Sequence, residues 1–224
     1  MPKLPDLDPD NTAQRCPVML LIDTSGSMQG DRINAVNSGL AALKAHLADD
    51  PVAKISVELA VMTFNSKVSL VRDFSSLQEF EPPVLTAEYQ TFLGEGVTQA
   101  LSAINDRKRM LKDAGLPYYR PLLFIFTDGN PEGELPTVIE DAQRRLAEAT
   151  KRKEVEVFPI GIGDGIDLDQ LTRIAGKQAL RLDEAKWAEL FKWLSASVAA
   201  VSRSAGAGNQ AALPVPGWAQ FSTN

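Results

Sequence analysis

The sequence predicts an α/β domain with a doubly wound, mostly parallel six-stranded sheet, one antiparallel edge strand and helices on both faces. Two observations carry this prediction. Short continuous apolar runs alternate along the chain with stretches in which apolar residues recur every three or four positions. The continuous runs are typical of strands buried on both faces, and the periodic stretches are typical of amphipathic helices. This alternation favours right-handed crossovers around one core, for which 224 residues suffice.

The first half of the chain contains three of the expected strands. Residues 17–22 (PVMLLI) form an apolar run, and residues 33–47 carry the apolar spacing of a helix that packs on it. Residues 55–64 and 67–74 read as two strands around a tight turn at residues 65–66, which predicts a hairpin. The second strand of this hairpin is the expected antiparallel edge strand.

The second half alternates helices and strands after a loop with two consecutive prolines. Helices are expected at residues 97–111, 138–146, 168–175 and 187–201, and strands at residues 122–126, 155–162 and 178–182. Pro159 lies inside one of these strands and has no amide proton, so it should occupy a bulge or an unpaired position.

Residues 16–204 are expected to form the single folded domain. Residues 1–15 precede it as a flexible segment, and residues 205–224 follow as an uncharged tail rich in Ala, Gly and Pro that has too little apolar surface for a core. The tail nevertheless carries four large apolar residues, which we expect to bind a partner or a neighbouring copy. These residues are Leu213, Val215, Trp218 and Phe221.

Charge and cysteine content exclude several classes of function. The chain has 23 Lys and Arg against 29 Asp and Glu, a net charge of −6, which disfavours nucleic acid as a partner. No apolar stretch has the length of a membrane span or the pattern of a signal peptide, so we expect no membrane partner. Cys16 is the only cysteine, which excludes an internal disulfide and a zinc site with several thiolates. These features predict a cytoplasmic protein.

Three segments rich in side-chain oxygen follow expected strands or precede an expected helix. They are residues 23–28 (DTSGSM), 91–95 (TFLGE) and 127–129 (TDG). Because ligands of open α/β sheets bind outside the carboxyl ends of the strands, we expect these segments to meet. They contribute two carboxylates and three hydroxyls, namely Asp23, Ser25, Ser27, Thr91 and Asp128. Oxygen ligands without His or Cys suit a hard cation, Mg²⁺ first, with Mn²⁺ and Ca²⁺ as alternatives.

The three hydroxyls indicate what such a metal site would do. If Ser25, Ser27 and Thr91 bind the ion directly while the two aspartates act through water or hydrogen bonds, the metal keeps much of its positive field. It would then attract an acidic group from a partner protein. A helix N-cap explains Asp23 and one serine but leaves the Thr-Asp-Gly segment unexplained.

The Asp-x-Ser-x-Ser segment, the downstream Thr and the Thr-Asp-Gly segment together resemble the metal-ion-dependent adhesion site (MIDAS) of von Willebrand factor type A domains, over roughly residues 16–202. Within that superfamily, four stretches are similar to the bacterial TerY-like group: residues 23–40, 85–101, 120–129 and 181–199. The resemblance implies Mg²⁺ held by Ser25, Ser27 and Thr91 with Asp23 and Asp128. One departure is visible, because Tyr89-Gln90 stands where small Gly-rich residues usually precede the Thr.

The resemblance implies a protein-binding module that is not an enzyme and that captures a carboxylate or phosphate of a partner protein. The TerY-like similarity implies a bacterial signalling or stress-response setting, such as tellurite resistance, with a cognate Ser/Thr protein kinase and a PP2C-type phosphatase. An alternative is a phosphorylation-controlled switch whose candidate substrates are Thr24, Ser25, Ser27 and Thr91. A metal-assisted hydrolase is a further alternative, but it needs a general base, and the sequence offers none beyond the two aspartates.

Overall fold

The computed structural model describes residues 11–203 and 219–220. In this part of the chain, seven strands form one sheet in the order β3-β2-β1-β4-β5-β6-β7. The five inner strands are parallel: β1 (Cys16–Asp23), β2 (Val57–Phe64), β4 (Leu122–Thr127), β5 (Glu156–Ile162) and β6 (Leu180–Leu182). The predicted α/β class and all six predicted strands are confirmed.

Antiparallel strands close both edges of the sheet. At one edge, β3 (Val68–Ser76) pairs with β2, as the hairpin pattern predicted. At the other edge, β7 (Ala219–Gln220) pairs with β6 over two positions. This seventh strand was not predicted, and it lies within the segment expected to be a tail. The four apolar tail residues expected to bind a partner lie outside the described residues: Leu213, Val215, Trp218 and Phe221.

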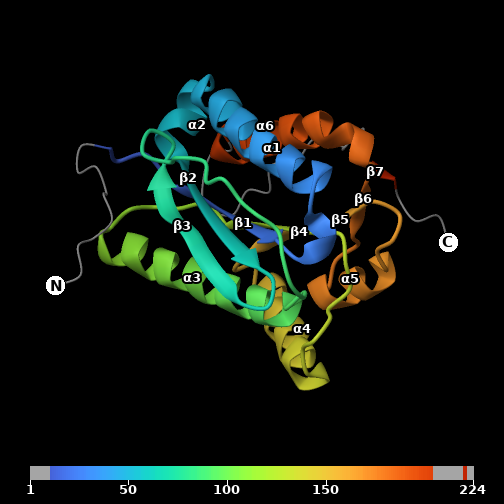
Figure 1. Cartoon of the computed structure of the whole chain (residues 1–224). Coiled ribbons are helices and arrows are strands. Elements are labelled where there is room, and N and C mark those ends of the chain that lie inside the picture. Colours follow the sequence, from blue (N-terminus) through green and yellow to red (C-terminus); the bar gives the residue numbers. More distant parts are fainter. Residues whose placement is uncertain (1–10, 204–218, 221–224) are drawn as a thin grey trace.

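Within residues 11–203, six α-helices cover the two faces of the sheet (Figure 1). One face packs against α1 (Asp31–Ala48), α2 (Pro51–Ser56) and α6 (Trp187–Arg203). The other packs against α3 (Leu93–Asp113), α4 (Pro136–Lys151) and α5 (Leu168–Ala175). Along β1, Leu20 points into the first core and Leu21 into the second. This alternation explains why the inner strands are apolar without interruption.

Helix α2 corrects one predicted boundary. Ile55 and Ser56 were expected in the second strand, but they belong to α2, and β2 begins at Val57. The Asp50 side chain accepts hydrogen bonds from the backbone amides of Val52, at 2.9 Å, and Ala53, at 3.0 Å. An aspartate cap followed by proline in the first helical turn is a usual way to begin a helix. The Asp-Pro pair was the available signal.

The packed domain also begins earlier than the expected boundary at residue 16. The side chain of Arg15 is buried, although residues 1–15 were expected to form a flexible segment. The amide of Arg15 donates to the carbonyl of Pro117, and its carbonyl accepts from the amide of Tyr119, both at 2.8 Å. Residues 11–15 therefore contribute to the fold, whereas residues 1–10 lie outside the described part.

Pro159 lies in β5 opposite Ile125 of β4, in a regular parallel register. Pairing of β5 with β6 starts at Ile160, so the ladder on that side begins after the proline. The sequence left open a bulge or an unpaired position for Pro159. The structure shows no bulge; Pro159 has a strand partner in β4 but none in β6.

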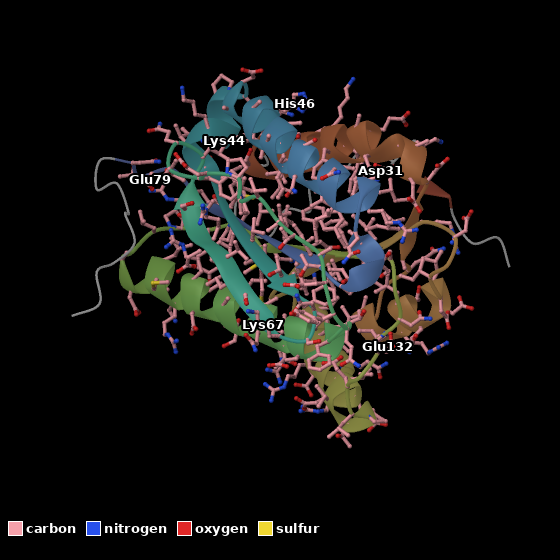
Figure 2. The ribbon with its side chains drawn as sticks, in the orientation of Figure 1. Asp31, Lys44, His46, Lys67, Glu79 and Glu132 are labelled. Carbon is pink, nitrogen blue, oxygen red and sulfur yellow. The ribbon has the colours of Figure 1, made fainter. Side chains whose placement is uncertain are left out.

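The carboxyl ends of β1 and β4 define the part of the sheet that matters for function. The chain leaves β1 towards β2 across one face of the sheet and reaches β4 through α3 on the other face, so the strand order reverses between β1 and β4. Figure 2 shows Asp31, Lys67 and Glu132 around this edge and His46 at the far end of α1. A crevice at such a reversal of strand order is the usual ligand site of an open α/β sheet.

No helix among residues 11–203 has the length and apolar character needed to cross a membrane.

Candidate metal centre

The first loop of the centre begins at the last residue of β1. The carboxylate of Asp23 is fully buried, and its Oδ1 accepts a hydrogen bond from the amide of Ser25 at 2.8 Å. A short 3₁₀ helix, η1 (Gly26–Met28), then turns the chain so that Oγ of Ser25 and Oγ of Ser27 lie 3.2 Å apart. The Asp-x-Ser-x-Ser spacing thus places one carboxylate and two hydroxyls together.

The loop after β4 joins the first loop through side-chain hydrogen bonds. Oγ1 of Thr127 donates to Oδ2 of Asp23 at 2.6 Å, and Oγ of Ser27 donates to Oδ1 of Asp128 at 2.7 Å. These contacts connect residues more than a hundred positions apart, because β1 and β4 are neighbouring parallel strands that end together. The predicted carboxylates and serines therefore form one cluster.

Thr91 reaches the cluster from the loop before α3. A Cβ atom placed on Gly129 would lie 3.7 Å from Oγ1 of Thr91 and 3.9 Å from Oγ of Ser27, so both hydroxyls approach the same glycine. Backbone contacts hold this loop on either side: the amide of Gly26 donates to the carbonyl of Tyr89 at 2.9 Å, and the amide of Glu132 donates to the carbonyl of Thr91 at 3.1 Å. The structure thus brings all five predicted residues to one place.

Tyr89 has a backbone conformation that explains the sequence departure before Thr91. Its φ angle is +72°, in the left-handed region that favours glycine, and its side chain is 67% exposed. At Tyr89 the loop therefore adopts a backbone conformation that glycine favours, although the residue there carries an exposed aromatic side chain.

Burial dominates the electrostatics of Asp23. Removal from water raises the pKa of its carboxyl to about 6. Hydrogen bonds from Thr127 and Ser25 oppose that rise, and the nearby charge of Asp128 adds to it. A buried carboxyl held against its own ionisation gains from a cation beside it.

The sequence pattern of the chain decides its family. The model of the von Willebrand factor type A (VWA) domain matches residues 18–192. The chain belongs to this family. No similar sequence was found among curated proteins.

Solved structures share the VWA fold with this chain at low sequence identity. A von Willebrand factor type A protein from Catenulispora acidiphila has a TM-score of 0.57 and 18% identity, with 84% of this chain and 43% of that chain covered. The ArnB paralog VWA2 from Sulfolobus acidocaldarius has a TM-score of 0.57 and 17% identity, with 83% and 46% covered. Proximal thread matrix protein 1 from the mussel byssus, with a zinc occupied MIDAS motif, has a TM-score of 0.55 and 20% identity, with 84% and 49% covered. The chain therefore spans less than half of each of these three structures.

The donor set of this VWA domain fits a hard divalent cation. Residues 11–203 and 219–220 contain no group of three or more His, Cys, Asp or Glu side chains arranged for a metal. The centre instead offers two carboxylates and three hydroxyls, a set of oxygen donors of the kind that Mg²⁺ prefers. A cation there would depend on Ser25, Ser27 and Thr91, with Asp23 and Asp128 to balance its charge.

The sequence argument missed four residues at or beside the VWA site: Thr127, Arg32, Glu184 and Glu134. Thr127 fixes Asp23, as described above. Arg32, in the first turn of α1, donates from Nη1 to Oδ2 of Asp128 and from Nη2 to Oε1 of Glu184, the latter at 2.6 Å. The Thr-Asp-Gly segment signalled Thr127, but no sequence signal pairs Arg32 with acids 96 and 152 positions away.

Glu134 supports the loop that carries Thr91. Its Oε2 accepts from the amide of Gly94 at 2.7 Å and its Oε1 accepts from the amide of Glu95 at 2.8 Å. These amides belong to the first turn of α3, where an acidic group is favourable. The loop after β4 thus anchors the start of α3 next to the centre.

Proposed function

We propose that this VWA domain is a metal-ion-dependent protein-binding module. Mg²⁺, or Mn²⁺ or Ca²⁺ in its place, would be held by Ser25, Ser27 and Thr91 with Asp23 and Asp128, and a carboxylate or phosphate of a partner protein would complete its coordination. The observation that carries the proposal is the convergence of these oxygen donors from three loops at the reversal of strand order.

The charge balance of the centre supports capture of an anionic group. The two carboxylates of the centre could formally cancel the charge of a divalent cation. Asp23, however, accepts a hydrogen bond from Thr127, and Asp128 is bound by Ser27 and by the positive charge of Arg32. They therefore neutralise the cation only in part. Hydroxyl ligands are neutral, so the cation keeps part of its field towards solvent. A partner carboxylate or phosphate would meet that field at the exposed side of Ser27.

The surroundings of the centre support a binding role that is not enzymatic. Catalysis of hydrolysis needs a base placed to take a proton from water. The carboxylates described at the centre are bound to neighbouring groups: Asp23 to Thr127, Asp128 to Ser27 and Arg32, and Glu184 to Arg32. His46 lies in the last turn of α1, at the opposite end from the centre.

A second candidate function is a phosphorylation-controlled switch, and the exposure of Ser27 favours it at that position. Of the four candidate hydroxyl residues, Thr24, Ser25 and Thr91 are buried, whereas Ser27 is exposed. A phosphate on Ser27 would add negative charge beside Asp128 and occupy the place of the partner's acidic group. The similarity to the TerY-like group supports a cognate Ser/Thr kinase and a PP2C-type phosphatase as partners of such a switch.

Metal dependence of partner capture tests the main proposal. Immobilised protein should retain its partner from a lysate in Mg²⁺ and release it in EDTA. Ser27→Ala should weaken capture by about tenfold or more, because it removes a metal ligand, while the fold persists because Ser27 lies at the rim. Ser38→Ala, an exposed serine on α1, serves as the matched control.

Calorimetry with MgCl₂ tests the site itself. Wild type should bind weakly alone and more tightly with an acidic partner, because the partner supplies a missing ligand. Asp23→Ala should abolish the binding heat. Capture that persists in EDTA would place the interface elsewhere.

A further inference from the structure

Arg32 connects two acidic residues at the edge of the metal centre. Its Nη1 contacts Oδ2 of Asp128 and also donates to the carbonyl of Ser27 at 3.1 Å. Its Nη2 donates to Oε1 of Glu184, which stands at the start of η2 (Glu184–Lys186), immediately before α6. One guanidinium therefore joins the loop after β1, the loop after β4 and the segment that leads into the last helix.

Arg32 neutralises a carboxylate that has no access to water. The side chain of Asp128 is 0% exposed, whereas that of Arg32 is 28% exposed. A buried carboxylate is costly unless a positive charge or hydrogen bonds compensate it. Ser27 satisfies Oδ1 of Asp128, and Arg32 satisfies Oδ2. Arg32 thus occupies the role of counter-ion that a divalent cation beside Asp128 would also perform.

The pairing of Arg32 with Glu184 is built into the fold at Gly163. A Cβ atom at this position would lie 2.6 Å from Oε1 of Glu184 and 3.3 Å from Nη2 of Arg32. Gly163 also has a φ of +73°, which a side chain rarely tolerates. The end of β5 therefore leaves the space in which the two charged groups meet.

We propose that Arg32 is an internal counter-ion that competes with a divalent cation for Asp128, and that Glu184 moderates this competition. The inference rests on the proposed metal centre. A cation near Asp128 meets the like charge of Arg32, whereas Glu184 offsets part of that charge and holds the guanidinium from its other side. Metal binding is consequently coupled to the segment that precedes α6.

Calorimetry with MgCl₂ alone, without a partner, tests the competition by the direction in which each variant changes the affinity for Mg²⁺. Arg32→Gln should bind Mg²⁺ about tenfold more tightly, because it removes a neighbouring positive charge. Glu184→Gln should bind about two- to fivefold more weakly, because Arg32 then acts on Asp128 without its second partner. In the double variant, Glu184→Gln should add little, since Glu184 acts through Arg32.

Two controls separate this inference from general charge effects and from loss of fold. Arg109→Gln removes the same charge from an exposed ion pair with Asp106 and should leave the affinity unchanged. Thermal melts should show that Arg32→Gln is less stable than wild type without metal and gains more from Mg²⁺, because Asp128 has lost its counter-ion. Should Arg32→Gln fail to fold, Glu184→Gln, whose side chain is 42% exposed, still decides the sign.

An unchanged or weaker affinity in Arg32→Gln would overturn the inference and make Arg32 a residue that positions Asp128 for the metal. So would a tighter affinity in Glu184→Gln. If wild type binds Mg²⁺ and Asp23→Ala does not, these results for Arg32→Gln and Glu184→Gln overturn only the inference about Arg32, and the proposed metal centre stands. If neither wild type nor Arg32→Gln binds Mg²⁺, the proposed function and this inference are both wrong.

Discussion

At the scale of single residues, Asp23 links the metal centre to pH. Its carboxyl has a pKa raised from 3.8 to about 6, chiefly by burial. Well below pH 3.8 this group is protonated in both the folded and the unfolded chain, so it makes no difference to the free energy of unfolding between pH values there. As the pH rises towards 6, the unfolded chain ionises first, so the contribution of Asp23 to the metal-free fold becomes progressively unfavourable.

We therefore predict two opposite pH effects of Asp23. From pH 4 to pH 6 the metal-free wild type should lose stability relative to Asp23→Asn, which has no carboxyl at this position. Urea unfolding of both proteins across this range measures the difference in their free energies of unfolding. Mg²⁺ affinity of wild type should instead rise through this range, because the cation displaces the proton. Equal Mg²⁺ affinity at pH 5 and pH 7 would contradict a role of the ionised Asp23 in the site.

At the scale of elements, a buried ion pair ties β2 to α3 at the end of the sheet away from the metal centre. Arg107 donates from Nε and Nη2 to both carboxylate oxygens of Glu58, at 2.8 and 2.6 Å. Arg15 lies 3.5 Å from the same carboxylate, and all three side chains are at most 5% exposed. Two cations share one acid, so the acid is the critical member.

Glu58→Ala should therefore destabilise the domain by about 3–5 kcal/mol, because it leaves buried guanidinium charge without its acid. Chemical denaturation measures this loss. Asp141→Ala is the matched control, since Asp141 forms its ion pairs with Arg144 and Arg145 at the exposed surface, and this variant should lose little stability. Mg²⁺ affinity should change in neither variant. Similar stability of the two variants would show that the buried pair contributes no more than a surface pair.

At the scale of the whole molecule, β7 is the described part of the segment 205–224. The two residues Ala219 and Gln220 pair with Leu182 and Arg181 of β6, a strand of only three residues. Few backbone hydrogen bonds join the segment to the sheet in the described part of the chain. We expect this two-residue pairing to contribute little to the stability of the domain.

Deletion of residues 205–224 should leave the melting temperature and Mg²⁺ affinity nearly unchanged, because the metal loops and both cores remain. Partner association should weaken, because Trp218 and Phe221 supply apolar area of the kind that anchors interfaces. Pull-down with the truncated chain and with Trp218→Ala in the full chain measures this. Full partner affinity in both proteins would show that the segment has no part in binding.

The sequence by itself determined the order and type of the main elements and the five oxygen donors of the centre. Apolar runs such as residues 17–22 marked β1 because burial on both faces requires them, and the Asp-x-Ser-x-Ser spacing acts within one loop. Local patterns of this kind are visible along the chain. They missed α2, whose start depends on a single Asp-Pro pair, and β7, which has two residues.

Only the tertiary structure decided which distant groups meet. Thr127 reaches Asp23 because β1 and β4 end together, and Arg32 reaches Asp128 and Glu184 because α1 begins where the loops after β4 and before α6 converge. The burial that raises the pKa of Asp23 likewise comes from packing around the loop. Contacts and desolvation depend on the positions of groups in space, which have no period or spacing along a sequence.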